Sequence, residues 1–299
     1  MLNPILESSA RRRMRTEKTP LILTVYIAVL LLFSVYQLSM FFSSGITVGQ
    51  MRLSTEWYIW LTALELLLIV VTAPALSAAS IAGERERQTF SLLLVTGVGT
   101  RKIIIGKLME NFAFLALLIL SGAPVMMLAH ITAGIPVLQL VLTILFLMLI
   151  ALEALAVGLL VSALCRRTLT AIIITYLAIV LLGGGAWALS KHGPLAAHYT
   201  YEMLAGLSSQ NTAQVLLDMP LPVFFCPAVG LVSLLAHQTG ILHTTMQSTM
   251  RLYDIYTAMK HAGFGAVAAA SFFAGSVSTF ALLLLSMLSL HAQTKGKRR

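Results

Sequence analysis

Long uninterrupted runs of apolar residues alternate with short charged segments along this chain of 299 residues. A membrane-spanning helix needs about 20 predominantly apolar residues. Backbone in hydrocarbon has to satisfy its hydrogen bonds within the segment, which favours helices. The pattern therefore predicts an all-α integral membrane protein with one transmembrane domain over 20–291. Its six spans are expected near 20–42, 57–81, 107–131, 137–164, 168–190 and 263–291.

The stretch 191–262 is long, mixed and only partly apolar. Within it, LPVFFCPAVGLVSLLAH at 221–237 is short and carries two prolines near its start. A full span with that pattern is disfavoured, so we interpret the piece as a re-entrant or interfacial helix. A seventh or eighth span in this region is the alternative.

Composition and charge placement fix the class and the orientation. Hydrophobic residues make up 58% of the chain and charged residues 10%, which excludes an ordinary soluble enzyme. Of the 20 Lys and Arg residues, 16 lie in four segments that alternate spans would bring to one face. By the positive-inside rule that face is cytoplasmic, so we expect both termini, including the basic tail 292–299, in the cytoplasm of a cell-membrane protein. The same orientation makes 191–262 an external loop. Topology and anionic lipids explain the basic charge, and no nucleic-acid partner is expected.

The first 19 residues form a unit of their own. Asn3 and Pro4 are suited to the start of a helix. Apolar residues recur every four positions after them, and Pro20 is expected to end the helix. This predicts an amphipathic helix in the cytoplasmic headgroup layer. The alternative is that the RRRMR run at 11–15 is only a topology anchor.

An island of charge, IAGERERQTFSLLLVTGVGTRKIIIGK, separates the second and third spans at 81–107. Gly83 is expected to stop the second span, and the four charged residues after it to open a new helix with acids in its first turn. Phe90, Leu93 and Leu94 would give that helix an apolar face. A turn at Gly97 and Gly99 and a helix cap at Thr100 follow. The alternative is a loop with ordinary topology charges.

The residues GERERQTFSLLLVT and KIIIGK of this island resemble the coupling segment of ABC exporter permeases of the type-2 (ABC-2) class. The starting pattern NPILE, RRRMR and TP, and GLLVSALCRRTLTA at 158–171, are also similar to that family. Gln88 and Gly97 depart from the family pattern, which often has Gly and Pro there. The resemblance implies that segment 83–100 docks on a separate ATPase, with these residues in contact: Gly83, Glu84, Arg85, Glu86, Arg87, Thr89, Phe90, Leu93, Leu94 and Arg101.

The resemblance also implies the assembly. Two permease copies, identical or related, would enclose the substrate route and bind two ATPase subunits, which hold ATP and Mg²⁺. This chain itself is expected to need no cofactor and to catalyse nothing, because Gly106-Lys107 lacks both the upstream Gly and the following Ser or Thr of a phosphate-binding loop. The family resemblance favours export, and membrane lipids are the remaining partners. The substrate is not encoded in any motif that we can identify.

Two carboxylates, Glu65 and Glu153, lie inside predicted spans, where a charge costs about 2.5–3.5 kcal/mol. They could line the transport route, bind a cation or carry a proton, or they could be hydrogen-bonded structural groups. They also support an alternative function, a standalone ion-coupled secondary transporter or channel. An intramembrane enzyme or assembly factor is a third. Histidine spacing on the external side gives no metal site.

Overall fold

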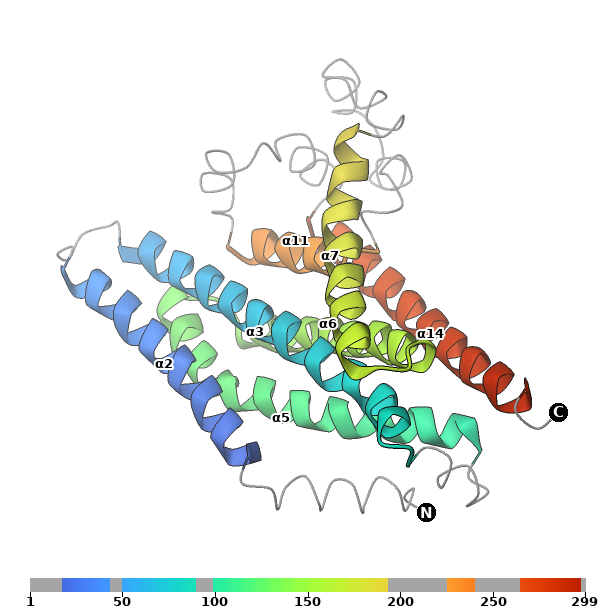
Figure 1. Cartoon of the computed structure of the whole chain (residues 1–299). Coiled ribbons are helices and arrows are strands. Elements are labelled where there is room, and N and C mark those ends of the chain that lie inside the picture. Colours follow the sequence, from blue (N-terminus) through green and yellow to red (C-terminus); the bar gives the residue numbers. More distant parts are fainter. Residues whose placement is uncertain (1–17, 44–49, 90–98, 193–224, 240–263, 297–299) are drawn as a thin grey trace, which may run out of the picture.

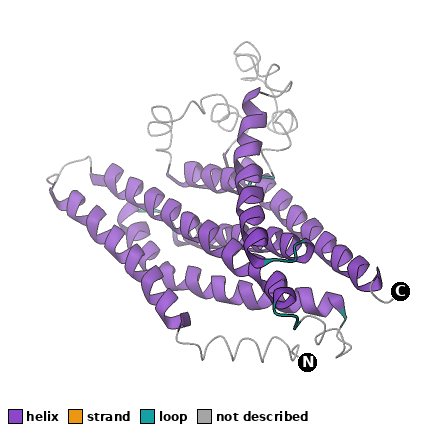
Figure 2. Ribbon diagram, in the orientation of Figure 1, coloured by secondary structure: helices purple, strands orange, loops and turns teal. Residues whose placement is uncertain are grey.

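The computed structural model describes residues 18–43, 50–89, 99–192, 225–239 and 264–296, and every regular element in these ranges is an α-helix (Figure 2). The predicted amphipathic helix at 1–19 therefore lies outside the described residues, except for its last two positions. Gly97, in the predicted turn, also lies outside them. The helices are α2 (Lys18–Ser43), α3 (Gln50–Glu86), α5 (Thr100–Ala133), α6 (Val137–Leu164), α7 (Thr168–His192), α11 (Pro227–Thr239) and α14 (Phe264–Gly296).

Five of the helices in the described ranges are long and apolar enough to cross a membrane: α2, α3, α5, α6 and α14. The side chains of α7 are described only as far as Gly183, and its described apolar part, Thr168–Gly183, is shorter. The integral membrane α-helical class is thus confirmed, whereas six spans stay a prediction. Most helices extend past their predicted ends. Pro20 lies in the first turn of α2, a position that proline tolerates because the N–H there has no partner within the helix.

α6 is the centre of the bundle. It packs against α3, α5, α7, α11 and α14. In an apolar stretch of 18 residues, 67% of the residues of α6 are buried inside the chain, compared with 17% for α2. Figure 1 shows α2 and α14 on opposite sides of the bundle, with α3, α5 and α6 between them. Apolar side chains on the outer helices stay exposed because hydrocarbon solvates them, and helix contact in lipid depends on close packing instead.

The crossing of α3 and α6 is unusually close. A methyl group placed on Gly158 would lie 1.8 Å from the Ser77 Oγ and 3.3 Å from the backbone nitrogen of Ala78. One turn further along α6, the Ser162 hydroxyl accepts hydrogen bonds from the backbone N–H groups of Ile81, at 3.0 Å, and Ala82, at 2.9 Å. Gly158 and Ser162 therefore form a small-residue contact on α6, with α3 as its partner.

The turn between α5 and α6 depends on a glycine. Gly134 has φ 68° and ψ 25°, the left-handed conformation that ends a helix, and its N–H bonds the carbonyls of His130 and Ile131. Pro136 then precedes the first residue of α6. The imidazole Nε2 of His130 lies 2.8 Å from the Pro136 carbonyl oxygen, which closes the turn.

α11 runs antiparallel to α14. Gly230 lies against Ser271, whereas His237, further along α11, lies against Gly265, earlier in α14. Gly275, a turn beyond Ser271, lies beside the carboxylate of Glu153 in the middle of α6. The start of α11 is therefore level with the middle of α6.

The other end of α11 is tied to the start of α6 by a polar network. The amide nitrogen of Gln238 donates to the Gln139 carbonyl at 3.0 Å. Its amide oxygen accepts from the Tyr58 hydroxyl at 3.1 Å. The Tyr58 and Thr143 hydroxyls are 2.8 Å apart. Both cysteines are free: Cys165 directly follows α6, and Cys226 directly precedes α11.

Gly158→Ala tests the close crossing. The added methyl group has no room, so we expect a loss of about 1–3 kcal/mol in the free energy of unfolding, as overpacking typically produces. Gly183→Ala in α7 is the matched control, because nothing lies within 4 Å of its Cβ position, and alanine is the better helix former. Thermal unfolding in detergent measures both. Equal melting temperatures for the two variants would show that the helices separate easily.

Candidate functional site: the cytoplasmic ends of α3, α5 and α7

The charged island begins as the last turn of α3. We predicted that Gly83 would stop this helix and that Glu84 would open a new one, and both predictions are wrong: α3 continues to Glu86. The Arg87 N–H bonds the Gly83 carbonyl at 3.1 Å, so the helical ladder runs through the glycine. The absence of a side chain at Gly83 instead admits a neighbour, because a Cβ there would lie 3.3 Å from the Thr168 methyl group.

α3 ends at Gln88. Its φ of 60° is left-handed. The N–H of Gln88 bonds the Arg85 carbonyl at 3.1 Å, and the N–H of Thr89 bonds the Glu84 carbonyl at 3.0 Å. This pair of bonds is the Schellman motif, in which the left-handed position usually holds glycine. Gln88 is one of the two positions where the sequence departs from the ABC-2 pattern, and a glycine is what its conformation favours.

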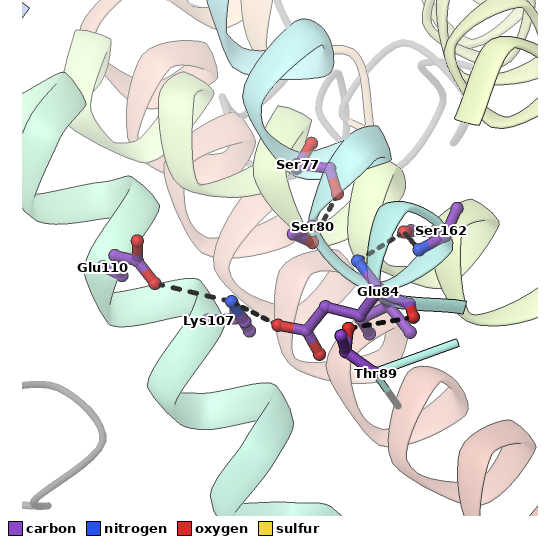
Figure 3. Close-up of polar contacts among 9 residues, drawn as sticks. Ser77, Ser80, Glu84, Thr89, Lys107, Glu110 and Ser162 are labelled. Atoms are coloured by element: carbon purple, nitrogen blue, oxygen red, sulfur yellow. Dashed lines mark hydrogen bonds and ion pairs between the residues drawn. The ribbon is translucent and has the colours of Figure 1, made fainter. Parts of the chain in front are cut away.

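Glu84 is directed toward α5. One of its carboxylate oxygens lies 2.7 Å from the Lys107 ammonium, which is also 3.8 Å from Glu110 (Figure 3). The other oxygen of Glu84 is buried without a hydrogen-bond partner. Both side chains of the close pair are mostly buried, 20% exposed for Lys107 and 25% for Glu84. The pair therefore fastens the end of α3 to the start of α5.

Glu86 is directed toward α7. The same carboxylate oxygen accepts the backbone N–H of Thr168 at 3.0 Å and the Thr168 hydroxyl. Acids favour the N-terminus of a helix because of the helix dipole. That preference was expected to act on a helix beginning at Glu84, but it acts on α7, which Glu86 caps from another helix. Thr168 is the first residue of α7.

Arg85 and Thr100 complete the picture of the helix ends. The guanidinium of Arg85 donates to the Cys165 carbonyl, at the end of α6, at 3.3 Å. α5 begins at Thr100, and its N-cap is Gly99, with no side-chain cap bond. The expected cap at Thr100 is thus wrong by one residue, because the Gly99 carbonyl already accepts the N–H groups of Lys102 and Ile103.

These contacts surround a half-open cavity of about 830 Å³. Its lining comes from the last three turns of α3, the two residues Arg87 and Thr89 after it, the first turns of α5, and the start of α7. The lining residues are Leu76, Ala79, Ser80, Gly83, Glu84, Glu86, Arg87, Thr89, Lys107, Glu110, Asn111 and Thr168. Beside it, Arg87, Gln88, Thr89, Gly99, Arg101 and Lys102 are exposed at the same end of the bundle. The predicted contact residues Phe90, Leu93 and Leu94 lie outside the described residues.

The two glutamates of the predicted spans do not line this cavity, and both are buried within the chain. Glu65 is fully buried, and one of its oxygens accepts the Tyr26 hydroxyl at 3.3 Å. Glu153 is 6% exposed, and one of its oxygens accepts the Ser278 hydroxyl at 2.8 Å. The second oxygen of each carboxylate is buried with no hydrogen-bond partner.

The family model of ABC-2 family transporter proteins matches residues 5–293, nearly the whole chain. The chain belongs to the ABC-2 transporter family. The resemblance found in the charged island is thereby confirmed, and so is a membrane permease as the general role. Permeases of this family are membrane subunits that generally work with an ABC ATPase. No curated protein matches this sequence significantly.

Substitution of Gln88 tests the end of α3 in this ABC-2 permease. Glycine adopts a left-handed φ without the steric cost that other residues carry, about 1–2 kcal/mol. We therefore expect Gln88→Gly to raise the melting temperature in detergent. Arg87→Gly, one residue earlier, where φ is not positive, is expected to lower it. Destabilisation by both substitutions would contradict the left-handed ending.

Proposed function

We propose that this chain is the permease subunit of an ATP-driven ABC-2 exporter that couples to a separate ATPase through the coupling segment 83–100, together with Arg101. One observation supports the proposal most directly: the last turn of α3 is bound to three other helices. Glu84, Arg85 and Glu86 bind α5, the end of α6 and the start of α7, respectively. A partner that pushes on this turn would therefore move several spans together.

The docking surface in this proposal consists of the exposed residues on both sides of 90–98. Arg87 is the exposed basic residue before this stretch, and Arg101 and Lys102 are the exposed basic residues after it. The ion pair between Glu84 and Lys107 keeps the two sides together. The surface carries positive charge, so a complementary partner would present acidic groups. Phe90, Leu93 and Leu94 are proposed as the apolar part of the same contact.

Glu84 and Glu86 have a different role in this proposal from the one expected of them. The sequence suggested charges offered directly to a partner. Their carboxylates are engaged within the chain, so we propose that they hold the segment in place, and that Arg87, Thr89 and Arg101 are the nearer contacts. Gly83 contributes by admitting Thr168.

The assembly is proposed to contain two permease copies, identical or related, and two ATPase subunits, which hold ATP and Mg²⁺. α7 is proposed as the sixth span. Its 25 residues would extend about 38 Å as a helix, longer than the hydrocarbon layer. Both termini would then be cytoplasmic. α11 is proposed as a re-entrant helix, since its 13 residues extend about 20 Å and its start is level with the middle of α6.

Co-purification tests the coupling. The chain is co-expressed with the ATPase encoded beside it and isolated in nanodiscs, and native mass spectrometry counts the copies. We expect a stable complex, and at least tenfold weaker association for Arg87→Glu and Arg101→Glu. Arg251→Glu, in the predicted external loop, is the matched charge reversal and should leave association unchanged.

Two outcomes would contradict the proposal. Transport driven by an ion gradient without any ATPase would favour the secondary carrier. Association that is lost for Arg251→Glu, but kept for Arg87→Glu and Arg101→Glu, would place the docking surface and the orientation on the other side of the membrane.

A part for Glu65 and Glu153 in the transport route is a separate proposal. It is supported by their unpartnered, buried oxygens. Glu153→Gln keeps an oxygen for the Ser278 hydroxyl but removes the charge, so the variant is expected to fold and to lose transport if charge is used. Ser278→Ala is the control, because it removes the hydrogen bond and keeps the carboxyl group. Full transport by Glu153→Gln would exclude a charge-based role.

A further inference from the structure

The start of α7 lacks a cap of its own. The first N–H groups of a helix have no partner within it, and Ser, Thr, Asp or Asn just before the helix usually supplies one. The residues between α6 and α7 are Cys165, Arg166 and Arg167, and none of them has a side-chain oxygen. Glu86 of α3 supplies the acceptor instead, with one oxygen on both the N–H and the hydroxyl of Thr168.

The contact lies at an exposed position and has a charged acceptor. Its acceptor is an ionised carboxylate, and charge-assisted hydrogen bonds are shorter and stronger than neutral ones. It also lies at the positive end of the α7 dipole. The close approach of Thr168 to Gly83 adds a van der Waals contact beside the two hydrogen bonds. The end of α3 and the start of α7 are thus joined as one unit.

Elsewhere α7 is lightly held. It packs on α3 and α6, and many of its large apolar side chains face outward, including Leu169 (74% exposed), Ile173 (66%) and Val180 (66%). The Tyr176 hydroxyl donates to the Val71 carbonyl of α3 at 2.6 Å. Both of these polar contacts join α7 to α3. The contact nearest the coupling segment is the one between Thr168 and Glu86.

We infer that Glu86 is a positioning residue that makes α7 follow the cytoplasmic end of α3 when the ATPase moves the coupling segment. This inference rests on the proposed function and assigns docking and transmission of movement to different residues of the coupling segment. The exposed residues of segment 83–100, together with Arg101, bind the ATPase. Glu86 passes the displacement to α7, and the pair of Glu84 with Lys107 passes it to α5. Loss of Glu86 leaves docking intact and releases α7 alone.

Distances between spin labels in the permease–ATPase complex test this. Cys165 and Cys226 are replaced by Ser, and one protomer per complex carries the labels. One label pair joins α7 to α14, which the last turn of α3 does not bind, at Ile173→Cys and Leu288→Cys. The reference pair joins α5 to α14, at Ile105→Cys and Leu288→Cys. All three sites are exposed. The complex is measured without nucleotide and with ATP and Mg²⁺ bound to a hydrolysis-deficient ATPase.

We expect ATP to change both distances in the unsubstituted complex. In Glu86→Ala the change in the α7 pair should fall at least threefold, while the α5 pair and ATPase association remain within the error of the parent. Glu86→Gln keeps an acceptor oxygen and should restore most of the α7 change. Should Glu86→Ala fail to fold, Thr168→Val, which removes the hydroxyl bond alone, is expected to reduce the α7 change by a smaller factor.

Three results would overturn the inference. ATP could change the distance of the α7 label pair as much in Glu86→Ala as in the parent complex or, where that variant does not fold, as much in Thr168→Val. Both label pairs could lose their response together, which would make Glu86 a general support of the fold. The α7 pair could fail to respond to ATP even in the parent complex. Absence of any ATPase complex for the parent protein is a different failure, because it removes the proposed function on which the inference rests.

Discussion

Between Ser77 and Ser162, α3 and α6 lie closer together than helices with ordinary side chains can. Gly158 leaves the space, and the Ser162 hydroxyl takes two backbone N–H groups of α3. In lipid there is no hydrophobic force between helices, so close packing and hydrogen bonds have to hold them. Since α6 contacts five other helices, this crossing sets where α3 ends relative to the rest of the bundle.

The polar contacts at the end of α3 follow from that position. Three consecutive charged residues each reach a different neighbour: Glu84 contacts Lys107, Arg85 contacts the Cys165 carbonyl, and Glu86 contacts Thr168. Successive residues of a helix point about 100° apart, so one turn of charged residues can bind elements on several sides. The segment that precedes the proposed ATPase contact is therefore rigidly placed by its own chain.

The intramembrane glutamates show how burial alone leaves function open. Each has one oxygen on a hydroxyl and one without a partner, and each lies among helices of one chain. The proposed roles in coupling and in transport thus concern different parts of the molecule, and substitutions can separate them.

Much of the fold could be predicted from sequence because a bilayer imposes a length and an apolar composition on each span. α6 begins and ends where the pattern placed it, at 137 and 164, and the charged island marked the region where three helix ends meet. The start of α11 beside the middle of α6 was not predictable in detail, because the depth of a 13-residue helix depends on which residues of α14 it packs against.

The sequence by itself determined the membrane class, most of the helices, the ABC-2 family and the segment to inspect. Only the tertiary structure decided what the charges in that segment do. Acids after a glycine predicted the start of a helix at Glu84, since local preferences were the only guide. In the folded chain Gly83 accommodates Thr168, Gln88 ends the helix, and Glu86 caps α7. Thr168, the partner of both Gly83 and Glu86, lies more than 80 residues away along the chain, and a local pattern carries no information about contacts at that distance.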